Sequence, residues 1–211
     1  MNILVIGATG NAGSAIYKEA VLRNLEITGL VRDKEKGEAL FGADSNLLIG
    51  DVNSLDETEL GNYDFVINAY ANRSDVDSML PVAQKIAGLV KSSNSKLVQL
   101  IGASSLFMDD GRTVLEHQIA KFGDVDWIEE PKIAIRIYEW LKTRDDFNWL
   151  AVSPNMNLID GLKTNYVIGK DQIIYDKNHQ ANVAVGNYAA GILDVLQKNE
   201  LNHTRFTVAD A

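Results

Sequence analysis

The first thirteen residues place the strongest constraint on how this chain folds. Met1–Ile6 (MNILVI) is a short apolar run rich in β-branched residues, and Gly7–Gly13 (GATGNAG) follows it directly. Residues 14–23 then read at helical spacing, so the order is strand, glycine-rich turn, helix. Such a turn leaves the first backbone N–H groups of the helix without partners and pointing outward. The segment therefore predicts an anion-binding site.

The three glycines of this turn have separate expected roles. By analogy with the dinucleotide-binding fingerprint, Gly7 permits a tight turn, Gly10 lets a pyrophosphate approach the backbone, and Gly13 lets the helix pack closely on the sheet. The spacing here is GxxGxxG, whereas the usual form is GxGxxG. A bare glycine triplet also occurs in plain loops, and the flanking strand and helix are what favour nucleotide binding.

The composition excludes several classes of protein. The chain has 211 residues, 46% of them hydrophobic, which is enough for one well-buried α/β domain. Its formal net charge of −9 argues against nucleic acid or an anionic membrane as the main partner, because both need a basic surface. The absence of cysteine excludes disulfides, thiolate metal sites and cysteine nucleophiles. No leader or membrane-spanning run is evident, so we expect a cytoplasmic protein.

Short apolar strands alternate with helices through the first half of the chain. This pattern is typical of a doubly wound parallel sheet covered on both faces, which binds ligands beyond the carboxyl ends of its strands. That rim would carry Gly7–Gly13, Arg32, Asp51, Asn68 and residues 102–105. The expected strands span residues 26–31, 47–49, 63–68 and 96–101, and the expected helices span 33–41 and 75–91.

The second half is less regular. Residues 103–126 lack clean periodicity, and we interpret them either as a mobile flap over the site or as an ordinary surface excursion. Further elements are expected as a helix at 132–142, a strand at 147–153, a helix at 187–197 and a strand at 205–208. The whole chain is then one Rossmann-like domain. Residues 155–185 would form a small C-terminal appendage on the substrate side, with two or three short strands in a hairpin-like arrangement at 166–185.

Several segments together resemble a known superfamily. The opening GATGNAG, Gly50-Asp51-Val52, Asn68 and Gly102-Ala103-Ser104-Ser105 look like the atypical short-chain dehydrogenase/reductases. The segments at 149–154, 186–190 and 205–209 are similar to the NmrA-like branch, and most of all to its group named for NADH-flavin reductases. The resemblance covers essentially the whole chain and implies a Rossmann-like fold that binds NAD(P). None of these motifs fixes a substrate.

The resemblance also implies roles for individual residues along the cofactor. Ser104 and Pro154 would lie beside the nicotinamide, with Ser104 as the candidate catalytic hydroxyl. Plain structural roles remain open for some of these residues, because Asp51 also suits a turn, Tyr70 a surface aromatic and Pro154 a strand end. The remaining implied contacts are Thr9, Gly10, Asn11 and Ala12 at the pyrophosphate, Asp51 and Val52 at the adenine, and Asn68, Ala69 and Tyr70 along the ribose.

Arg32 favours NADP(H) over NAD(H). An acidic residue about twenty positions after the glycine turn bonds the ribose 2′-hydroxyl of NAD, whereas an arginine there suits the 2′-phosphate of NADP. Asp33 follows at once and complicates the choice. We interpret Asp33 as the cap of a helix beginning at Lys34, which would point it away from the ribose.

Members of the superfamily usually carry out acid–base catalysis with a Tyr-x-x-x-Lys pair, and this chain has no tyrosine at the position expected for that pair. Tyr138 and Lys142 have the spacing but lie close to the strand at 147–153, and core packing also explains Tyr138. The segment Trp127–Lys132 (WIEEPK), where the pair is expected, contains no tyrosine. Reducing a ketone needs a proton donor, whereas a flavin or quinone accepts hydride into a delocalised ring that can take its proton from water.

The sequence therefore favours an NAD(P)H-dependent oxidoreductase with a flat small-molecule acceptor such as a flavin or quinone. Phe107, Met108 and Trp127 are candidates to line the acceptor pocket, although each could be a core residue. Asn155 adjoins the site and stands where biliverdin-reducing relatives are expected to carry histidine, which argues against that substrate. Two alternatives stay open: a non-catalytic NAD(P)-sensing regulator, and a carbonyl-reducing or epimerase-type enzyme. We read His117, His179 and His203 neither as metal ligands nor as bases.

Overall fold

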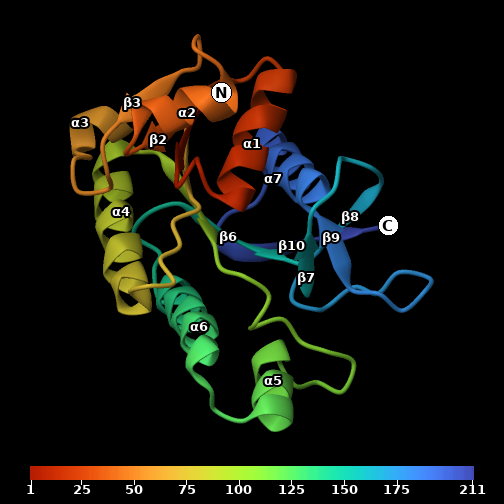
Figure 1. Ribbon diagram of the computed structural model, residues 1–211. Coiled ribbons are helices and arrows are strands. Elements are labelled where there is room, and N and C mark those ends of the chain that lie inside the picture. The colour runs from red at the N-terminus through yellow and green to blue at the C-terminus, as the bar shows by residue number, and fades with distance from the viewer.

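An eight-stranded sheet forms the centre of the computed structural model, which describes residues 1–211 (Figure 1). All neighbouring strands are parallel except the last pair, in which β8 runs antiparallel to β10. The expected Rossmann-like sheet is thereby confirmed. In spatial order the strands are β3 (Leu47–Ile49), β2 (Glu26–Val31), β1 (Asn2–Ile6), β4 (Phe65–Asn68), β5 (Lys96–Leu100), β6 (Trp149–Pro154), β10 (Thr204–Asp210) and β8 (Tyr166–Gly169).

Helices cover both faces of the sheet, and each face has its own hydrophobic core. Within β1, Ile3 and Val5 point to one core and Leu4 and Ile6 to the other, as the strand period of two requires. Strands buried on both faces read as continuous apolar runs. The first core lies under α1 (Asn11–Leu22), α2 (Lys34–Phe41) and α7 (Val185–Lys198), and the second under α3 (Glu57–Leu60), α4 (Met79–Ser93) and α6 (Glu129–Lys142).

The winding of the sheet reverses between β1 and β4. These two strands are neighbours in the sheet, with Ile6 in register with Asn68, although they are far apart in sequence. The turn after β1 and the loop after β4 therefore leave the sheet side by side at its carboxyl edge. A crevice at such a reversal is where doubly wound sheets bind their ligands.

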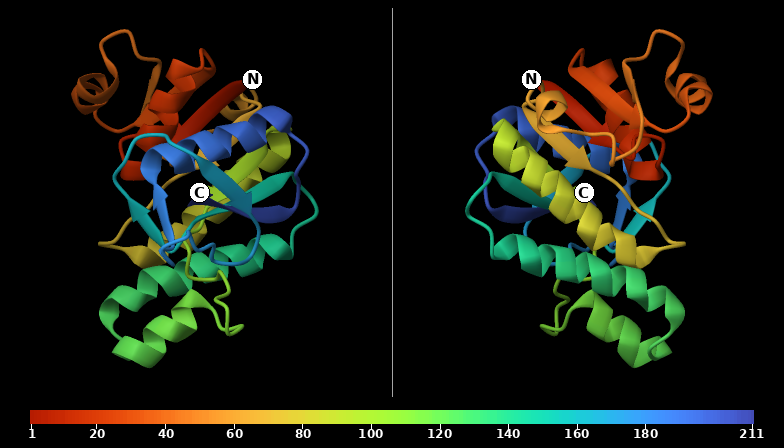
Figure 2. Two further views of the ribbon diagram at one scale, coloured as in Figure 1. Left: turned by 90° about the vertical axis from the view of Figure 1, so that its right-hand side faces the viewer. Right: turned by 90° about the vertical axis from the view of Figure 1, so that its left-hand side faces the viewer.

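The segment expected to be an irregular flap contains a regular helix. Helix α5 (Val114–Phe122) begins at a capping box, in which the Thr113 hydroxyl accepts the Glu116 amide and the Glu116 carboxylate accepts the Thr113 amide. A 3₁₀ turn, η2 (Asp126–Ile128), then leads into α6, and a second such turn, η1 (Val76–Ser78), precedes α4. Figure 2 shows that α5 (green) projects from the sheet beyond the end of α6.

The strands expected to form a hairpin pair differently. Strand β8 joins the edge of the main sheet beside β10, while β7 (Asn157–Ile159) and β9 (Asn182–Ala184) form a separate two-stranded parallel pair. The prediction of a hairpin at residues 166–185 is therefore wrong, because β8 and β9 do not pair with each other. No helix combines the length and the hydrophobicity that crossing a bilayer would need.

Asn187 ties this C-terminal region to the main domain. Its fully buried amide donates to Thr164 Oγ1 at 2.8 Å and to Asp210 Oδ1 at 2.7 Å, and it accepts the Thr164 amide at 2.6 Å. Loss of this side-chain amide would leave its buried partners without a hydrogen bond.

We predict that Asn187→Ala lowers the free energy of unfolding by about 2–3 kcal/mol, measured by urea denaturation. Asn178→Ala, at an exposed loop amide, should change it by less than about 0.5 kcal/mol.

Candidate functional site

The turn after β1 brings three backbones into close contact. Gly7 has a left-handed φ of +78°, and a side chain there would come within 2.7 Å of the Ala69 carbonyl oxygen in the loop after β4. The Gly10 amide donates to the Gly7 carbonyl at 3.0 Å. A Cβ on Gly13 would overlap that same carbonyl. Gly13 therefore lets α1 pack against its own turn, whereas the sequence argument placed the close contact on the sheet.

The first turn of α1 presents unpaired amides to the crevice. Gly10 is the N-cap and offers no side-chain bond, and the first turn carries no acidic residue. The amides of Asn11, Ala12 and Gly13 have no acceptor within the chain. The helices α2, α3 and α5, in contrast, are all capped by side chains and have acidic first turns. The N-terminus of α1 is thus arranged to bind an anion.

We predict that Gly13→Ala and a glycine-to-alanine change elsewhere in a helix have opposite effects on stability, because only Gly13 is required by a close backbone contact. The added methyl overlaps the Gly7 carbonyl, so the variant should lose stability and bind dinucleotide at least about tenfold more weakly. Gly88→Ala in α4 is the matched control, because its Cβ would meet nothing within 4 Å. That control should gain up to about 1 kcal/mol. Equal effects of the two changes on binding, measured by fluorescence titration, would contradict the role assigned to Gly13.

Arg32 and Asp33 separate in the structure as the capping argument expects. The Asp33 carboxylate accepts the Lys36 amide at 3.0 Å and is the N-cap of α2. Arg32 is exposed at the end of β2 and forms no ion pair within the chain. The carboxylate is therefore committed to the helix, whereas the guanidinium is available to a ligand.

Asp51 and Val52 occupy a turn after β3. The Asp51 carboxylate accepts the Asn53 amide at 2.7 Å, and its carbonyl accepts the Ser54 hydroxyl at 2.7 Å. Val52 is 7% exposed and contributes to the second core. Both residues thus have clear structural functions, and their contact with an adenine stays a prediction.

The end of β4 is held by polar contacts. The buried Asn68 amide donates to Gln99 Oε1 at 2.8 Å and accepts the Tyr70 amide at 3.1 Å. The Tyr70 hydroxyl lies 3.2 Å from Ser78 Oγ. These contacts fix the path of residues 68–70 beside the glycine turn, and the Ala69 amide bonds the Ile6 carbonyl at 3.0 Å.

A cleft of about 790 Å³ opens at this edge of the sheet, next to the N-terminus of α1. The predicted residues Ala12, Ala69, Tyr70, Ser104, Trp127 and Pro154 all line it. The Ser104 hydroxyl has no hydrogen-bond partner within the chain, so it is free to meet a ligand. The walls are largely apolar. Sequence reasoning missed part of them, namely Val76, Met79, Pro131, Ala134, Ile137, Leu158 and Tyr188.

The three aromatic and apolar candidates for the acceptor pocket divide between two places. Trp127 lines the cleft and is 49% exposed. Phe107 and Met108 do not line it. Phe107 bridges to Thr113 and Gln172, and Met108 packs on a small separate core that contains Leu106 and Ile173. The prediction that Phe107 and Met108 line the acceptor pocket is therefore wrong.

The expectation that Asn155 adjoins the substrate site is wrong. Its side chain is fully buried, donates to the Ile174 carbonyl at 2.6 Å and accepts the Ile174 amide at 3.3 Å. Both ends of the amide are used in holding the loop before β9. Asn155 therefore fastens this loop to the end of β6 and does not face the cleft.

Tyr138 and Lys142 lie outside the cleft. The face of α6 that lines it carries Glu130, Pro131, Ala134 and Ile137. The Lys142 ammonium lies 5.3 Å from the centre of the Tyr138 ring and pairs with Glu139 at 2.7 Å. Burial raises the pKa of Tyr138, with Arg205 acting in the opposite direction. A catalytic tyrosine of the superfamily type needs a lowered pKa, so the environment of Tyr138 does not suit that role.

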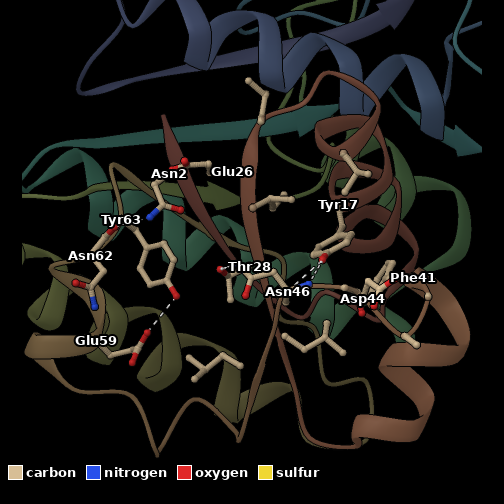
Figure 3. A pocket seen from close by; sticks show the side chains of 18 residues that line it. Asn2, Tyr17, Glu26, Thr28, Phe41, Asp44, Asn46, Glu59, Asn62 and Tyr63 are labelled. Carbon is tan, nitrogen blue, oxygen red and sulfur yellow. Dashed lines mark hydrogen bonds between the residues drawn. The ribbon is translucent and has the colours of Figure 1, made fainter.

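A second, larger groove of about 950 Å³ lies at the opposite end of β1 and β2 (Figure 3). Many of its polar side chains already bond each other: the Tyr17 hydroxyl bonds the Asn46 backbone, Asn46 Nδ2 donates to Thr28 Oγ1, and Tyr63 donates to Glu59. It contains none of the predicted cofactor residues. Across the chain, no group of three or more His, Cys, Asp or Glu side chains is placed to hold a metal ion.

Together the sheet order, the glycine turn and the open amides define a dinucleotide-binding protein of the Rossmann class. The chain belongs to the NAD(P)H-binding family, whose model matches residues 7–199. This result confirms the predicted nicotinamide cofactor and is consistent with the resemblance to atypical short-chain dehydrogenase/reductases.

Solved structures with the same fold extend over the whole chain. A Lactobacillus casei protein is 30% identical, with full coverage of both chains and a TM-score of 0.90. A Bacteroides thetaiotaomicron protein described as a candidate epimerase is 28% identical over 99% of this chain and 96% of its own, with a TM-score of 0.85. A Streptococcus pneumoniae protein described as a candidate NADH-flavin reductase is 24% identical with full coverage of both chains and a TM-score of 0.88.

Proposed function

We propose that this protein is an NADPH-dependent oxidoreductase that reduces a flat, conjugated acceptor such as a flavin or a quinone. The observation that carries the proposal is the largely apolar cleft beside the α1 N-terminus, which holds no Tyr-Lys pair of the superfamily type. Its charged lining residues are Arg73, Asp126 and Glu130, of which Arg73 and Glu130 pair with each other at 3.0 Å. Tyr70 is engaged with Ser78, and Tyr138 lies elsewhere. The description of the Streptococcus pneumoniae protein agrees with this proposal, and that of the Bacteroides thetaiotaomicron protein names the alternative class.

The residues of the cleft suggest how the reaction is supported. The open amides of residues 11–13 bind the pyrophosphate, and the close approach at Gly10 brings it against the backbone. NADPH, when bound, supplies the hydride. Ser104 orients the carboxamide or the acceptor through its free hydroxyl. Trp127 and the apolar residues of α6 would hold a flat acceptor against the nicotinamide, which would contribute proximity and orientation. The acceptor takes its proton from water.

The proposal predicts NADPH consumption by the purified protein with FMN, riboflavin or a quinone. Gly10→Trp places an indole in the pyrophosphate position and should abolish both turnover and NADPH binding. Tight binding of NADPH without turnover of any acceptor would favour an NAD(P)-sensing regulator instead. Turnover of carbonyl substrates that disappears in Tyr138→Phe would favour the carbonyl-reducing alternative.

Trp127 and Phe107 offer a matched pair for the acceptor site. Both are about half exposed, but only Trp127 lines the cleft. We predict that Trp127→Ala raises the KM for the acceptor about tenfold, because a stacking surface is lost, and leaves the Kd for NADPH within about twofold. Phe107→Ala should leave both constants within about twofold of wild type. An equal rise in KM in both variants would overturn the assignment of Trp127.

Arg32 is the residue proposed to select NADPH. Replacement by serine removes a charge-assisted contact to the 2′-phosphate, so Arg32→Ser should raise the Kd for NADPH about 10–100-fold and leave that for NADH nearly unchanged. Arg136→Ser, at an exposed arginine on α6, is the charge-matched control. Asp33→Asn keeps the helix cap and should affect neither nucleotide. A loss of NADH binding in Asp33→Asn would indicate NAD as the cofactor instead.

A further inference from the structure

Arg205 is a charged residue buried in the main domain. It lies on β10 in register with Ala151 of β6, and only 3% of its surface is exposed. A guanidinium taken out of water needs ion-pair and hydrogen-bond partners, since its burial is otherwise strongly unfavourable. The partners of Arg205 therefore show which parts of the chain it holds together.

The guanidinium joins segments that are distant in sequence. Its Nε and Nη2 donate to Asp171 Oδ1 at 2.9 and 2.7 Å. Its Nη1 donates to Ser105 Oγ at 2.5 Å, and Nη2 also approaches the Ser105 carbonyl oxygen at 3.4 Å. Its central carbon lies 4.6 Å from the centre of the Tyr138 ring. Arg205 thus links β10, the loop after β5, the loop after β8 and helix α6.

Ser105 is the neighbour of the candidate catalytic hydroxyl. Ser104 lines the cleft, and its backbone carbonyl accepts the Leu115 amide at 2.9 Å. The loop leaves β5 through Gly102, which has a left-handed φ of +67°. Between this turn and α5, Arg205 provides the side-chain contacts that hold the chain at Ser105. Ser104 therefore directly precedes a residue that Arg205 holds on both its hydroxyl and its carbonyl oxygen.

Tyr138 contributes its ring face to this cluster. The Tyr138 hydroxyl makes no hydrogen bond within the chain, while the ring lies against the Arg205 guanidinium. A cation over an aromatic ring is stabilised most when both are removed from water. The geometry gives Tyr138 a use that needs the ring and does not need the hydroxyl.

We propose that Arg205 is a positioning residue that fixes the Ser104–Ser105 loop at the nicotinamide end of the cleft, with Tyr138 as its aromatic support. The acceptor kinetics below rest on the reductase function proposed above. The exchange measurements do not, because they report on the loop itself.

The kinetic test separates the role of the Tyr138 ring from that of its hydroxyl, and it compares the contact between Arg205 and Ser105 with an unrelated arginine. Ser105→Ala, Arg205→Lys and Tyr138→Leu should each lower kcat for acceptor reduction about tenfold, with the Kd for NADPH within about twofold. Tyr138→Phe should keep most of the activity. Arg144→Met is the matched control, since Arg144 also stacks on aromatic rings, at Trp140 and Phe147, and pairs with Asp146 away from the cleft. It should leave kcat unchanged.

Hydrogen exchange supplies the readout that does not need an acceptor. In Ser105→Ala and Arg205→Lys, the amides of Leu106 and Leu115, which bond Ala103 and Ser104, should exchange about tenfold faster, while those of β1 stay protected. Unchanged exchange at these amides would overturn the proposal, as would a Tyr138→Phe variant as inactive as Tyr138→Leu. If the wild-type protein reduces no acceptor but the variants show the faster amide exchange, the proposed reductase function is wrong and the positioning of the Ser104–Ser105 loop by Arg205 is supported.

Discussion

The contact between the backbone of α1 and the carbonyl oxygen of Gly7 is the constraint on which the rest of the site depends. Because Gly13 has no side chain, the helix can approach its own turn closely enough to aim its first amides into the crevice. The same turn passes within van der Waals reach of Ala69, so the loops after β1 and β4 have a single relative placement. Backbone groups, more than side chains, therefore set the position of the anion site.

The first half of the fold could be predicted because its signals are local. Strands buried on both faces are short β-branched runs, as in Met1–Ile6, and their alternation with helices predicts a doubly wound parallel sheet. The strand order β3-β2-β1-β4-β5-β6 comes from the structure. The cap formed by Asp33 is equally local, since the carboxylate bonds an amide three residues away. The rim residues follow from the strand ends, which is why Ala12, Ala69 and Ser104 fall at the cleft.

The second half could be predicted less well because distant partners decide it. The parallel pairing of β7 with β9 and the addition of β8 to the sheet edge depend on contacts with β10 and α7, which no local pattern contains. The loop at 171–174 likewise decides the positions of Asn155, Phe107 and Met108, which contact it and so do not line the cleft. Helix α5 is different: Thr113 and Glu116 have the spacing of a capping box, so a signal for its start was present in the sequence.

The cleft and its rim differ in the groups that they offer to a ligand. The rim offers open backbone amides and close glycine contacts, which we propose hold the dinucleotide, and proteins that share a fold can keep such a rim while their cleft walls change. In this chain the cleft walls are mostly apolar side chains from α4, α6 and α7, with Trp127 at one side and Ser104 at another. The charged side chains that line the cleft are Arg73, Asp126 and Glu130, with Arg73 paired to Glu130. Arg205 and Tyr138 do not line it, and they pack on each other next to the loop that carries Ser104. Largely apolar walls suit the holding of two flat rings together more than the operation of a proton relay, and this is the ground on which we propose a conjugated acceptor.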